Sequence, residues 1–454
     1  MNTIISILTN QFFLLFLTIA SGLLIGKIKI KNFSLGVSGG IFTGIGIGWL
    51  VTNFAKNVKE GEAGYNIGKK ILSSGIVSSG FFVFFLLLFL TAIGLTVGKN
   101  IGSIFKRYGI KFVIIGAVIP TVSMLVTVGC FQLVRGSSVN GFEISGMFSG
   151  SMTSTPAYGT SLDVVSNLDI EKRYERLSES DRNRFLAMIN QDGSLTSENT
   201  PSLTQKQAEA FKEAAKSAVS LGYTVAFPFG VIVIVIMITL LPKLFGIDIE
   251  KEKDAYNKEL LESQSHGKVI ADQPLDFMLF AVVAVIGIVV GSINIPMGSF
   301  GKFSLGAAGG VLISALVFSY IGKIGPFNFR MDTKALSMVR EMGLTFFMSV
   351  VGLTYGYDVI NSLSGSGLSL ALMAIAVEAI AVLISFLIGH KVFKLNWVIL
   401  SGAICGGCTS APGLGAALST IGNDEPTAGY GAAQPFAILA NVILITVFHN
   451  MIFL

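Results

Sequence analysis

Long apolar runs, separated by shorter polar stretches, dominate the 454-residue chain. Clear examples lie at residues 3–23, 81–97, 112–134, 225–241 and 368–388. A helix needs about 20 mostly apolar residues to cross a bilayer, and these runs reach or approach that length. They lack the alternation of apolar and polar residues that is typical of strands in outer-membrane barrels. The pattern therefore predicts an all-α polytopic membrane protein.

The composition agrees with this prediction. Hydrophobic residues make up 52% of the chain and charged residues 13%, whereas soluble domains contain about 25% charged residues. The net charge of +5 fits basic loops on the inner side of a membrane and suggests no nucleic-acid partner. The first apolar run has no basic segment before it and no small-residue cleavage site, so we expect a retained helix rather than a signal peptide.

Four short sequences occur twice, in the same order. The pairs are FSLGVSGG and FSLGAAGG (33–40 and 303–310), GLTVG and GLTYG (94–98 and 352–356), GSMTSTPAYG and GGCTSAPGLG (150–159 and 406–415), and GYTVAFPF and GYGAAQPF (222–229 and 429–436). One such pair can arise by chance, but four pairs in one order indicate a duplication. We call the third pair the broken motifs and the first pair the FSLG copies. The FSLG copies are expected to pack closely against neighbouring helices, on a scaffold or dimer surface.

The spacing of these pairs divides the chain into parts. The first membrane repeat is 1–245, a charged linker follows at 246–273, and the second membrane repeat is 274–454. A solvated insertion at 166–217 lengthens the first repeat; within it, 178–191 and 204–217 read as helices, with Thr204 as an N-cap. Each repeat has five spans plus one re-entrant or broken segment, and an odd number of spans makes the repeats inverted. Basic loops place the insertion outside and the linker inside.

Each broken motif places glycine, proline and hydroxyl residues next to apolar runs. Non-helical backbone at membrane depth is tolerated only where it is buried in protein or lines a cavity. A helix that starts inside the membrane points free N–H groups and a partial positive charge at such a cavity, which suits a carboxylate. The residues that we assign to substrate binding are Gly150, Thr153, Ser154, Thr155, Pro156, Gly406, Thr409, Ser410 and Pro412. The alternative is that small residues here only permit tight helix packing.

Polar residues in other spans are further candidates. Gln434, beside Pro435, is added to the predicted substrate ligands, and His449 is expected at the membrane interface. Glu378 lies in the middle of a span and has no acidic counterpart in the first repeat. Acidic residues inside a membrane usually serve a function or pair with a partner. Glu378 is therefore either a coupling or gating residue, or a packing residue that is protonated or hydrogen-bonded.

The sequence indicates no catalytic chemistry. Cys405 and Cys408 form a CxxC pair without histidines or a second pair, so we expect neither a metal nor a redox site there. Together with Cys130 they give no disulfide framework. The sequence contains no Walker A motif and no Ser/His/Asp arrangement. We expect no enzyme, no cofactor and no metal.

The broken motifs, together with GYTVAFPFG at 222–230, resemble the aspartate–alanine exchanger family of bacterial secondary transporters. The resemblance covers both repeats and implies a multi-pass protein of the bacterial inner membrane that exchanges or exports amino acids or dicarboxylates without ATP. It implicates the threonines, serines and prolines of the broken motifs, and structural roles fall to Gly222, Tyr223, Pro228, Tyr430 and Pro435. Many family members carry regulatory domains of the TrkA C-terminal type between the repeats, for which this linker is too short.

The favoured interpretation is a carrier for small carboxylates, such as aspartate, alanine or C4-dicarboxylates, that works by alternating access. Its expected partners are the substrate, the lipid bilayer and a second copy of the chain. Two alternatives stay open at this point. One is a sodium- or proton-coupled carboxylate symporter, and the other is an anion channel whose pore the broken helices would line.

Overall fold

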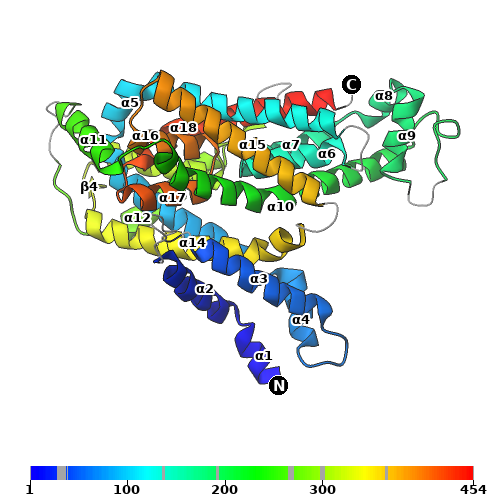
Figure 1. The fold of residues 1–454 in the computed structure, drawn as a ribbon, viewed down its shortest axis with the longest axis horizontal. Helices are drawn as coiled ribbons and strands as arrows, with labels where there is room; N and C mark the ends of the chain where they lie inside the picture. The colour runs from blue at the N-terminus through cyan, green and yellow to red at the C-terminus, as the bar shows by residue number, and fades with distance from the viewer. Residues whose placement is uncertain are drawn as a thin grey trace.

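The computed structural model describes residues 2–27, 37, 39–134, 139–190, 194–263, 270–296, 302–362 and 367–452. Helices make up most of this part of the chain, which confirms the all-α class (Figure 1). The helices before the linker are α1 (Asn2–Leu8), α2 (Gln11–Gly26), α3 (Gly39–Asn57), α4 (Tyr65–Ser74), α5 (Ser79–Leu133), α6 (Gly141–Ser151), α7 (Thr155–Asn167), α8 (Ile170–Glu175), α9 (Glu179–Ala187) and α10 (Gln205–Leu244).

The linker contributes one helix, and a second series of helices follows it. These are α11 (Ile249–Ser263), α12 (Phe277–Gly291), α13 (Gly306–Ile321), α14 (Thr333–Ser362), α15 (Gly367–Leu387) with the π-helix η3 (Ile388–Val392), α16 (Trp397–Gly407), α17 (Ala411–Ile421) and α18 (Pro426–Met451). Two small antiparallel hairpins pair β1 (Ile295–Pro296) with β2 (Lys302–Phe303) and β3 (Lys323–Ile324) with β4 (Phe327–Asn328).

Several helices are long and apolar enough to cross a membrane. Within the described residues these segments are Gly80–Lys99, Lys106–Leu133, Gln205–Leu244, Thr333–Asn361, Gly367–Val392 and Pro426–His449. Four of the predicted apolar runs coincide with them. Shorter apolar helices, among them α2, α12, α13, α16 and α17, add to this set. The chain is therefore a multi-pass membrane protein.

The prediction of one helix over the first apolar run, 3–23, is wrong. The run is divided between α1 and α2 at Asn10, whose side-chain oxygen accepts hydrogen bonds from the backbone N–H groups of Phe12 and Phe13 at 2.9 and 3.3 Å. An asparagine in this role caps a new helix N-terminus. One polar residue that can satisfy two free amides thus starts a second helix inside an otherwise apolar run.

The order of helices before the linker recurs after it. The helices α2, α3, α5, α6–α7 and α10 correspond to α12, α13, α14–α15, α16–α17 and α18, because α5 contains two membrane-length segments where the second series has two helices. Close packing recurs as well. Gly146 of α6 lies directly against the backbone of α10, and Gly402 of α16 lies directly against the backbone of α18. This agreement supports the duplication; the inverted orientation of the two copies stays a prediction.

The FSLG copies were expected to pack against neighbouring helices. In the second copy, Gly310 of α13 lies against Gly287 and Gly291 of α12, so close that a side chain at 310 would overlap the α12 backbone. In the first copy, Gly39 of α3 lies against Gly22 of α2, and most of the remaining positions fall outside the described residues. The expected close packing is therefore confirmed at both glycines.

The insertion has an apolar cluster of its own. Both predicted helices are present: α9 starts after Ser178, and α10 starts after Thr204, which forms a capping box with Gln207. The helix α10 does not end with the insertion but continues through the membrane segment to Leu244, across Gly222 and Pro228. The rings of Phe185 and Phe211 stack with their centroids 3.6 Å apart, at the centre of the cluster.

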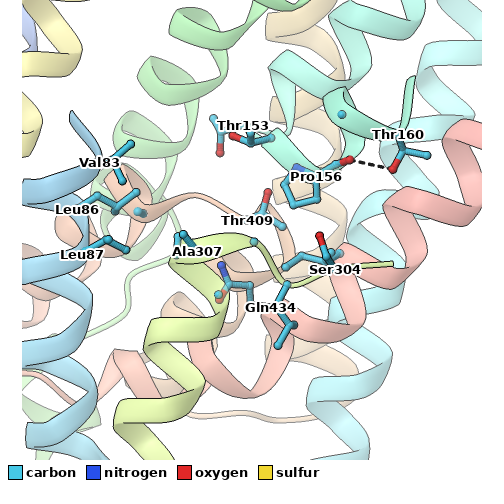
Figure 2. Close-up of a pocket in the computed structure, with 18 of the residues that line it drawn as sticks. Val83, Leu86, Leu87, Thr153, Pro156, Thr160, Ser304, Ala307, Thr409 and Gln434 are labelled. Atoms are coloured by element: carbon cyan, nitrogen blue, oxygen red, sulfur yellow. Dashed lines mark hydrogen bonds between the residues drawn. The ribbon is translucent and has the colours of Figure 1, made fainter. Parts of the chain in front are cut away.

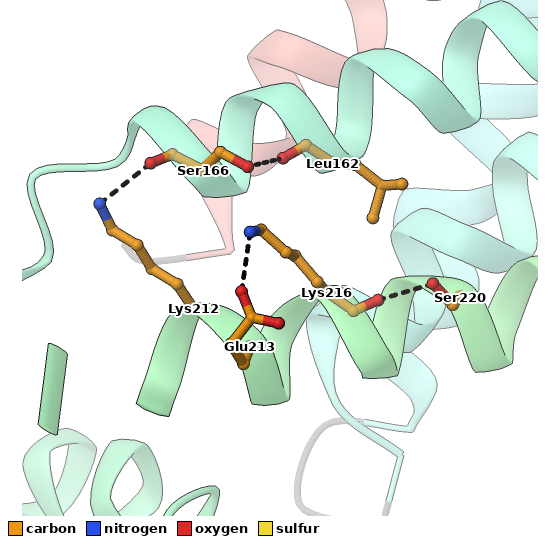
Figure 3. Close-up of polar contacts among 6 residues, drawn as sticks. All are labelled: Leu162, Ser166, Lys212, Glu213, Lys216 and Ser220. Atoms are coloured by element: carbon orange, nitrogen blue, oxygen red, sulfur yellow. Dashed lines mark hydrogen bonds and ion pairs between the residues drawn. The ribbon is translucent and has the colours of Figure 1, made fainter. Parts of the chain in front are cut away.

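Polar contacts join the insertion to α7, the second half of the first broken motif (Figure 3). The Nζ atom of Lys212 donates to the backbone oxygen of Ser166 near the end of α7, at 3.0 Å. Lys216 pairs with Glu213 along α10 at 2.9 Å. Exposed pairs of this kind contribute at most about 1 kcal/mol, so the apolar cluster is the main contact between the insertion and α7.

The linker helix α11 docks on the second broken motif. The Oε2 atom of Glu252 accepts from the backbone N–H of Trp397 at 2.6 Å, and the side chain of Asn396 donates to the backbone oxygen of Glu252 at 2.8 Å. In Figure 1, α11 lies at the left end of the molecule and the insertion helices α8 and α9 lie at the right end. The insertion and the linker therefore occupy opposite ends of the helical bundle.

Candidate functional site

The two broken motifs fold in the same way. In each, one helix ends, a short turn follows, and a second helix begins: α6 and α7 in the first motif, α16 and α17 in the second. The turn threonines, Thr153 and Thr409, both have positive φ angles, of 48° and 53°. Positive φ is uncommon for any residue other than glycine and costs more for a β-branched one. The same strained conformation at equivalent positions indicates a shared structural requirement.

Contacts between the two turns account for these threonines. The Oγ1 atom of Thr153 donates to the backbone oxygen of Cys408 at 3.3 Å, and the Oγ1 atom of Thr409 donates to the backbone oxygen of Met152 at 3.0 Å. Each threonine thus satisfies a buried carbonyl of the opposite motif. The structure brings together the two motifs that the sequence placed 256 residues apart, and the hydroxyl groups hold them in contact.

Ser154 and Ser410, both predicted substrate ligands, act in the structure as helix N-caps. The hydroxyl oxygen of Ser154 accepts from the backbone N–H of Ala157 at 3.4 Å, and that of Ser410 accepts from Gly413 at 3.2 Å. Both serines are fully buried. Both serines therefore start the helices α7 and α17, and neither lines the adjacent cavity; their assignment as substrate ligands stays a prediction.

A cavity of about 420 Å³ lies next to the turns (Figure 2). Of the predicted ligands, Thr153, Thr155, Pro156, Thr409, Pro412 and Gln434 line it, as does Tyr430 from the structural set. Sequence reasoning did not select three other groups of lining residues. These groups are Phe82, Val83, Leu86 and Leu87 of α5, the segment 304–309 at the start of α13, and Thr160 and Asp163 of α7.

Gly150 and Gly406, also predicted ligands, do not line this cavity. Gly150 lies against the backbone of Tyr223 in α10, and Gly406 lies against the backbone of Tyr430 in α18. Gly222 packs in the same way against the backbone of Glu143. A side chain at any of the three would overlap the neighbouring helix. The packing alternative therefore describes these glycines, whereas the threonines and prolines face the cavity.

Gln434 is the most buried amide on the cavity wall. Its side chain is 4% exposed, and its Nε2 atom lies 3.0 Å from the hydroxyl of Tyr430. Its Oε1 atom has no hydrogen-bond partner among the described residues. Leaving a buried polar atom unpaired costs about 1–3 kcal/mol, so an unpaired amide in a cavity wall favours a ligand that supplies the missing bond.

Glu378 and His449 lie outside the cavity. Glu378 is fully buried in α15, close to the thiols of Cys405 and Cys408 of the second broken motif and its preceding helix α16. His449 is fully buried in the protein, and its Nε2 atom lies 2.8 Å from the hydroxyl of Ser145, a partner from the first repeat that the sequence did not reveal. Its predicted position at the membrane interface stays a prediction.

The cavity is open beside one broken motif and closed beside the other. Val83, Asp163 and Asn294 on its wall are exposed, and α7 leads from there into the insertion. A Cβ atom built at Gly159 of α7 would have nothing within 4 Å. At the equivalent Gly415 of α17, it would lie 2.6 Å from Met348 Cε in α14.

An ion pair adds to the closure on the α17 side. Arg340 of α14 pairs with Asp424, three residues after the end of α17, and the two side chains are 21% and 15% exposed. The corresponding position on the open side is occupied by Phe82 of α5, which lines the cavity and carries no charge. The two halves thus differ in the contacts beside α7 and α17.

A family model described as a predicted permease membrane region matches residues 14–243 and 279–450. An uncharacterized transporter of Bacteroides fragilis is 25% identical over 98% of this chain and 99% of its own length; the alignment of 556 residues shows that it contains segments this chain lacks. Uncharacterized transporters of Bacteroides thetaiotaomicron and Geobacter sulfurreducens are 34% and 32% identical, each over 39% of this chain. These matches span 34% and 33% of the two relatives.

The family model leaves out the residues between 243 and 279, which correspond to the predicted linker, and covers most of both membrane repeats. The resemblance found in the broken motifs is therefore confirmed by a match over most of the chain. The chain is a membrane permease and belongs to the aspartate–alanine exchanger family.

Proposed function

We propose that the protein is a secondary transporter that exchanges or exports small carboxylates by alternating access. The observation that carries this proposal is the cavity between two hydrogen-bonded broken motifs, open beside α7 and closed beside α17. A carrier exposes its site to one side of the membrane at a time, and repeats that pack in two ways give it two such states. A cavity that is open beside α7 and closed beside α17 corresponds to one of these two states.

Counterflow in proteoliposomes tests this function. The purified full-length chain is reconstituted, loaded with unlabelled L-aspartate, L-alanine or succinate, and assayed for uptake of the labelled compound. We expect saturable uptake that is accelerated by substrate on the opposite side, with no ATP present. Absence of flux for a wider panel of amino acids and dicarboxylates would refute the carboxylate assignment. Unitary currents in a planar bilayer would instead favour the anion channel.

Ion-coupled symport is the second candidate, and the burial of Glu378 favours it. The carboxyl group of Glu378 has only weak thiol partners beside it, Cys405 and Cys408, and no stronger hydrogen-bond donor among the described residues. A carboxylate at membrane depth without a cation is costly. We infer that this group takes up a proton, or holds a cation, in one state of the cycle. Dependence of net uptake on a proton or sodium gradient would distinguish symport from exchange.

We also propose that the two repeats have opposite orientations in the membrane. The repeated order of helices and the predicted odd number of spans in each repeat support this. The helix α10 carries the chain from the insertion to α11 at the opposite end of the bundle (Figure 1). Single cysteines at Glu198 in the insertion and Lys258 in α11 test it with a membrane-impermeant maleimide. The three native cysteines are buried, so they give a low background. We expect labelling from opposite faces; labelling from the same face would overturn the five-span arrangement.

A further inference from the structure

The helix α13 begins at the cavity with its first turn uncapped. Residues 304–309, which include the end of the second FSLG copy, line the cavity. The preceding residue, Leu305, provides no side-chain cap, and Gly306 has a φ angle of +68°. The first backbone N–H groups of a helix have no partner within the helix and carry the positive end of its dipole. The amides of Gly306, Ala307 and Ala308 are therefore donors at the cavity wall.

The broken motifs offer fewer donors than their position suggests. In α7 the first three residues are Thr155, Pro156 and Ala157; proline has no N–H, and the N–H of Ala157 is bonded to Ser154. In α17, Pro412 likewise has no N–H, and the N–H of Gly413 is bonded to Ser410. Each half-helix thus keeps one free amide among its first three residues, whereas α13 keeps three. The larger anion-binding capacity lies on α13, which sequence reasoning assigned to a scaffold.

A second feature points to a ligand at the same place. The Oε1 atom of Gln434 is buried and unpaired among the described residues, and a Cβ atom built at Gly309 in the first turn of α13 would lie 4.0 Å from it. Figure 2 shows Gln434 beside Ala307 on the cavity wall. The Nε2 atom of the same amide donates to the hydroxyl of Tyr430. Gln434 therefore presents a free hydrogen-bonding atom next to a row of free amides.

We propose that the first turn of α13 and Gln434 form a subsite for one carboxylate group and the polar group on the carbon beside it. The amides of α13 bind the carboxylate oxygens, and Oε1 of Gln434 accepts from the neighbouring ammonium or hydroxyl group. Among the described residues that line the cavity there is no lysine or arginine, so backbone amides take the place of a cationic side chain. This proposal rests on the proposed function, since it locates the substrate within the same cavity.

The variant Ala307→Pro tests the amides directly. It removes one donor at the second helical position, where α7 and α17 already carry Pro156 and Pro412. The preceding residue is glycine, which tolerates the restriction that proline imposes on its neighbour. Ala307→Gly is the matched control, because it keeps the amide and removes only the methyl group. Ala308→Asp is a second variant, which places a fixed carboxylate at the same turn.

Binding to the purified full-length chain is measured by calorimetry with L-aspartate, L-alanine, propionate and inorganic phosphate. We expect Ala307→Pro to weaken L-aspartate binding about 10-fold or more and Ala308→Asp to abolish it. Ala307→Gly, which keeps the amide, should weaken binding far less than Ala307→Pro. Gln434→Leu should weaken the binding of L-alanine but leave the binding of propionate unchanged, because propionate lacks the amino group. Equal thermal unfolding midpoints for all variants show that folding is preserved.

The outcomes separate this proposal from the function on which it rests. If the wild type binds none of the carboxylates, the proposed function fails. If the wild type binds L-aspartate and the folded Ala307→Pro and Ala308→Asp variants bind it equally well, the function stands and the α13 subsite is wrong. If phosphate binds more tightly than every carboxylate, the amides form a general anion site, and the assignment to a carboxylate is overturned.

Discussion

Gly159→Leu is expected to trap the transporter in its open state without unfolding it. In the structure, nothing lies within 4 Å of a Cβ atom at this position, so a leucine side chain projects into the open cavity. Replacing a glycine inside a helix also stabilises that helix by roughly 0.5–1 kcal/mol. The variant should therefore fold at least as well as the wild type.

The variant Gly159→Leu becomes unfavourable only when α7 packs against α5 and closes the cavity. The closed geometry is visible at Gly415, where a Cβ atom would lie 2.6 Å from Met348 Cε and 2.7 Å from Leu344 Cδ1. If α7 approaches α5 as α17 approaches α14, a leucine at 159 overpacks that contact. Overpacking costs about 1–3 kcal/mol, which lowers the closed population by about 5- to 150-fold.

The assay is counterflow of L-aspartate at matched protein density, together with the thermal unfolding midpoint in detergent. Gly129→Leu is the control, since Gly129 lies in a membrane segment of α5, is exposed, and also has nothing within 4 Å of its Cβ position. We expect transport to fall at least about fivefold for Gly159→Leu and to be unchanged for Gly129→Leu. Normal transport by a folded Gly159→Leu variant would refute the closure of α7.

Three further predictions follow from individual contacts. Thr409→Val leaves the backbone oxygen of Met152 unpaired and should destabilise the protein by about 1–3 kcal/mol in denaturant unfolding. Thr153→Val should have a smaller effect, because the bond that it removes is longer. Unchanged stability would show that the hydroxyls do not join the motifs. Asp424→Asn weakens the pair with Arg340, so a cysteine at Ala416 should react faster with a maleimide, and an unaltered rate would argue against a latch. Glu378→Gln should retain exchange yet lose the pH or cation dependence of net uptake; if both dependences persist, Glu378 is a packing residue.

The elements that the sequence predicted best are those that local patterns determine. The run at 368–388 became α15, and Thr204 caps α10, because a spanning helix depends on apolar length and a cap depends on one side chain and nearby amides. The breaks in both motifs were predicted for the same reason, since proline beside a hydroxyl residue starts a helix. The division at Asn10 uses the same local chemistry, but within an apolar run that reads as continuous.

The cavity wall was predicted less well, because it depends on which helices meet. Nothing local distinguishes Gly309, beside the cavity, from Gly310, which packs against α12. Thr153 and Thr409 were selected from the motif pattern, but the bonds that they exchange join turns 256 residues apart, which no local pattern predicts. The sequence does not separate a cap from a ligand contact at Ser154 and Ser410, because both require the same hydroxyl group. The distances to Ala157 and Gly413 show the cap.

Alternating access of α7 and α17 is tested by labelling each half-helix in turn. One single-cysteine variant replaces Gly159, on the open side, and another replaces Ala416, which is 2% exposed on the closed side. Each variant is treated with an impermeant maleimide from each face of the membrane, with and without L-aspartate. We expect Gly159→Cys to react from the face of the insertion and Ala416→Cys to react from the opposite face. If L-aspartate lowers the labelling rate of one cysteine, it should raise the rate of the other. Reaction of both from the same face, or rates that L-aspartate leaves unchanged, would contradict alternating access.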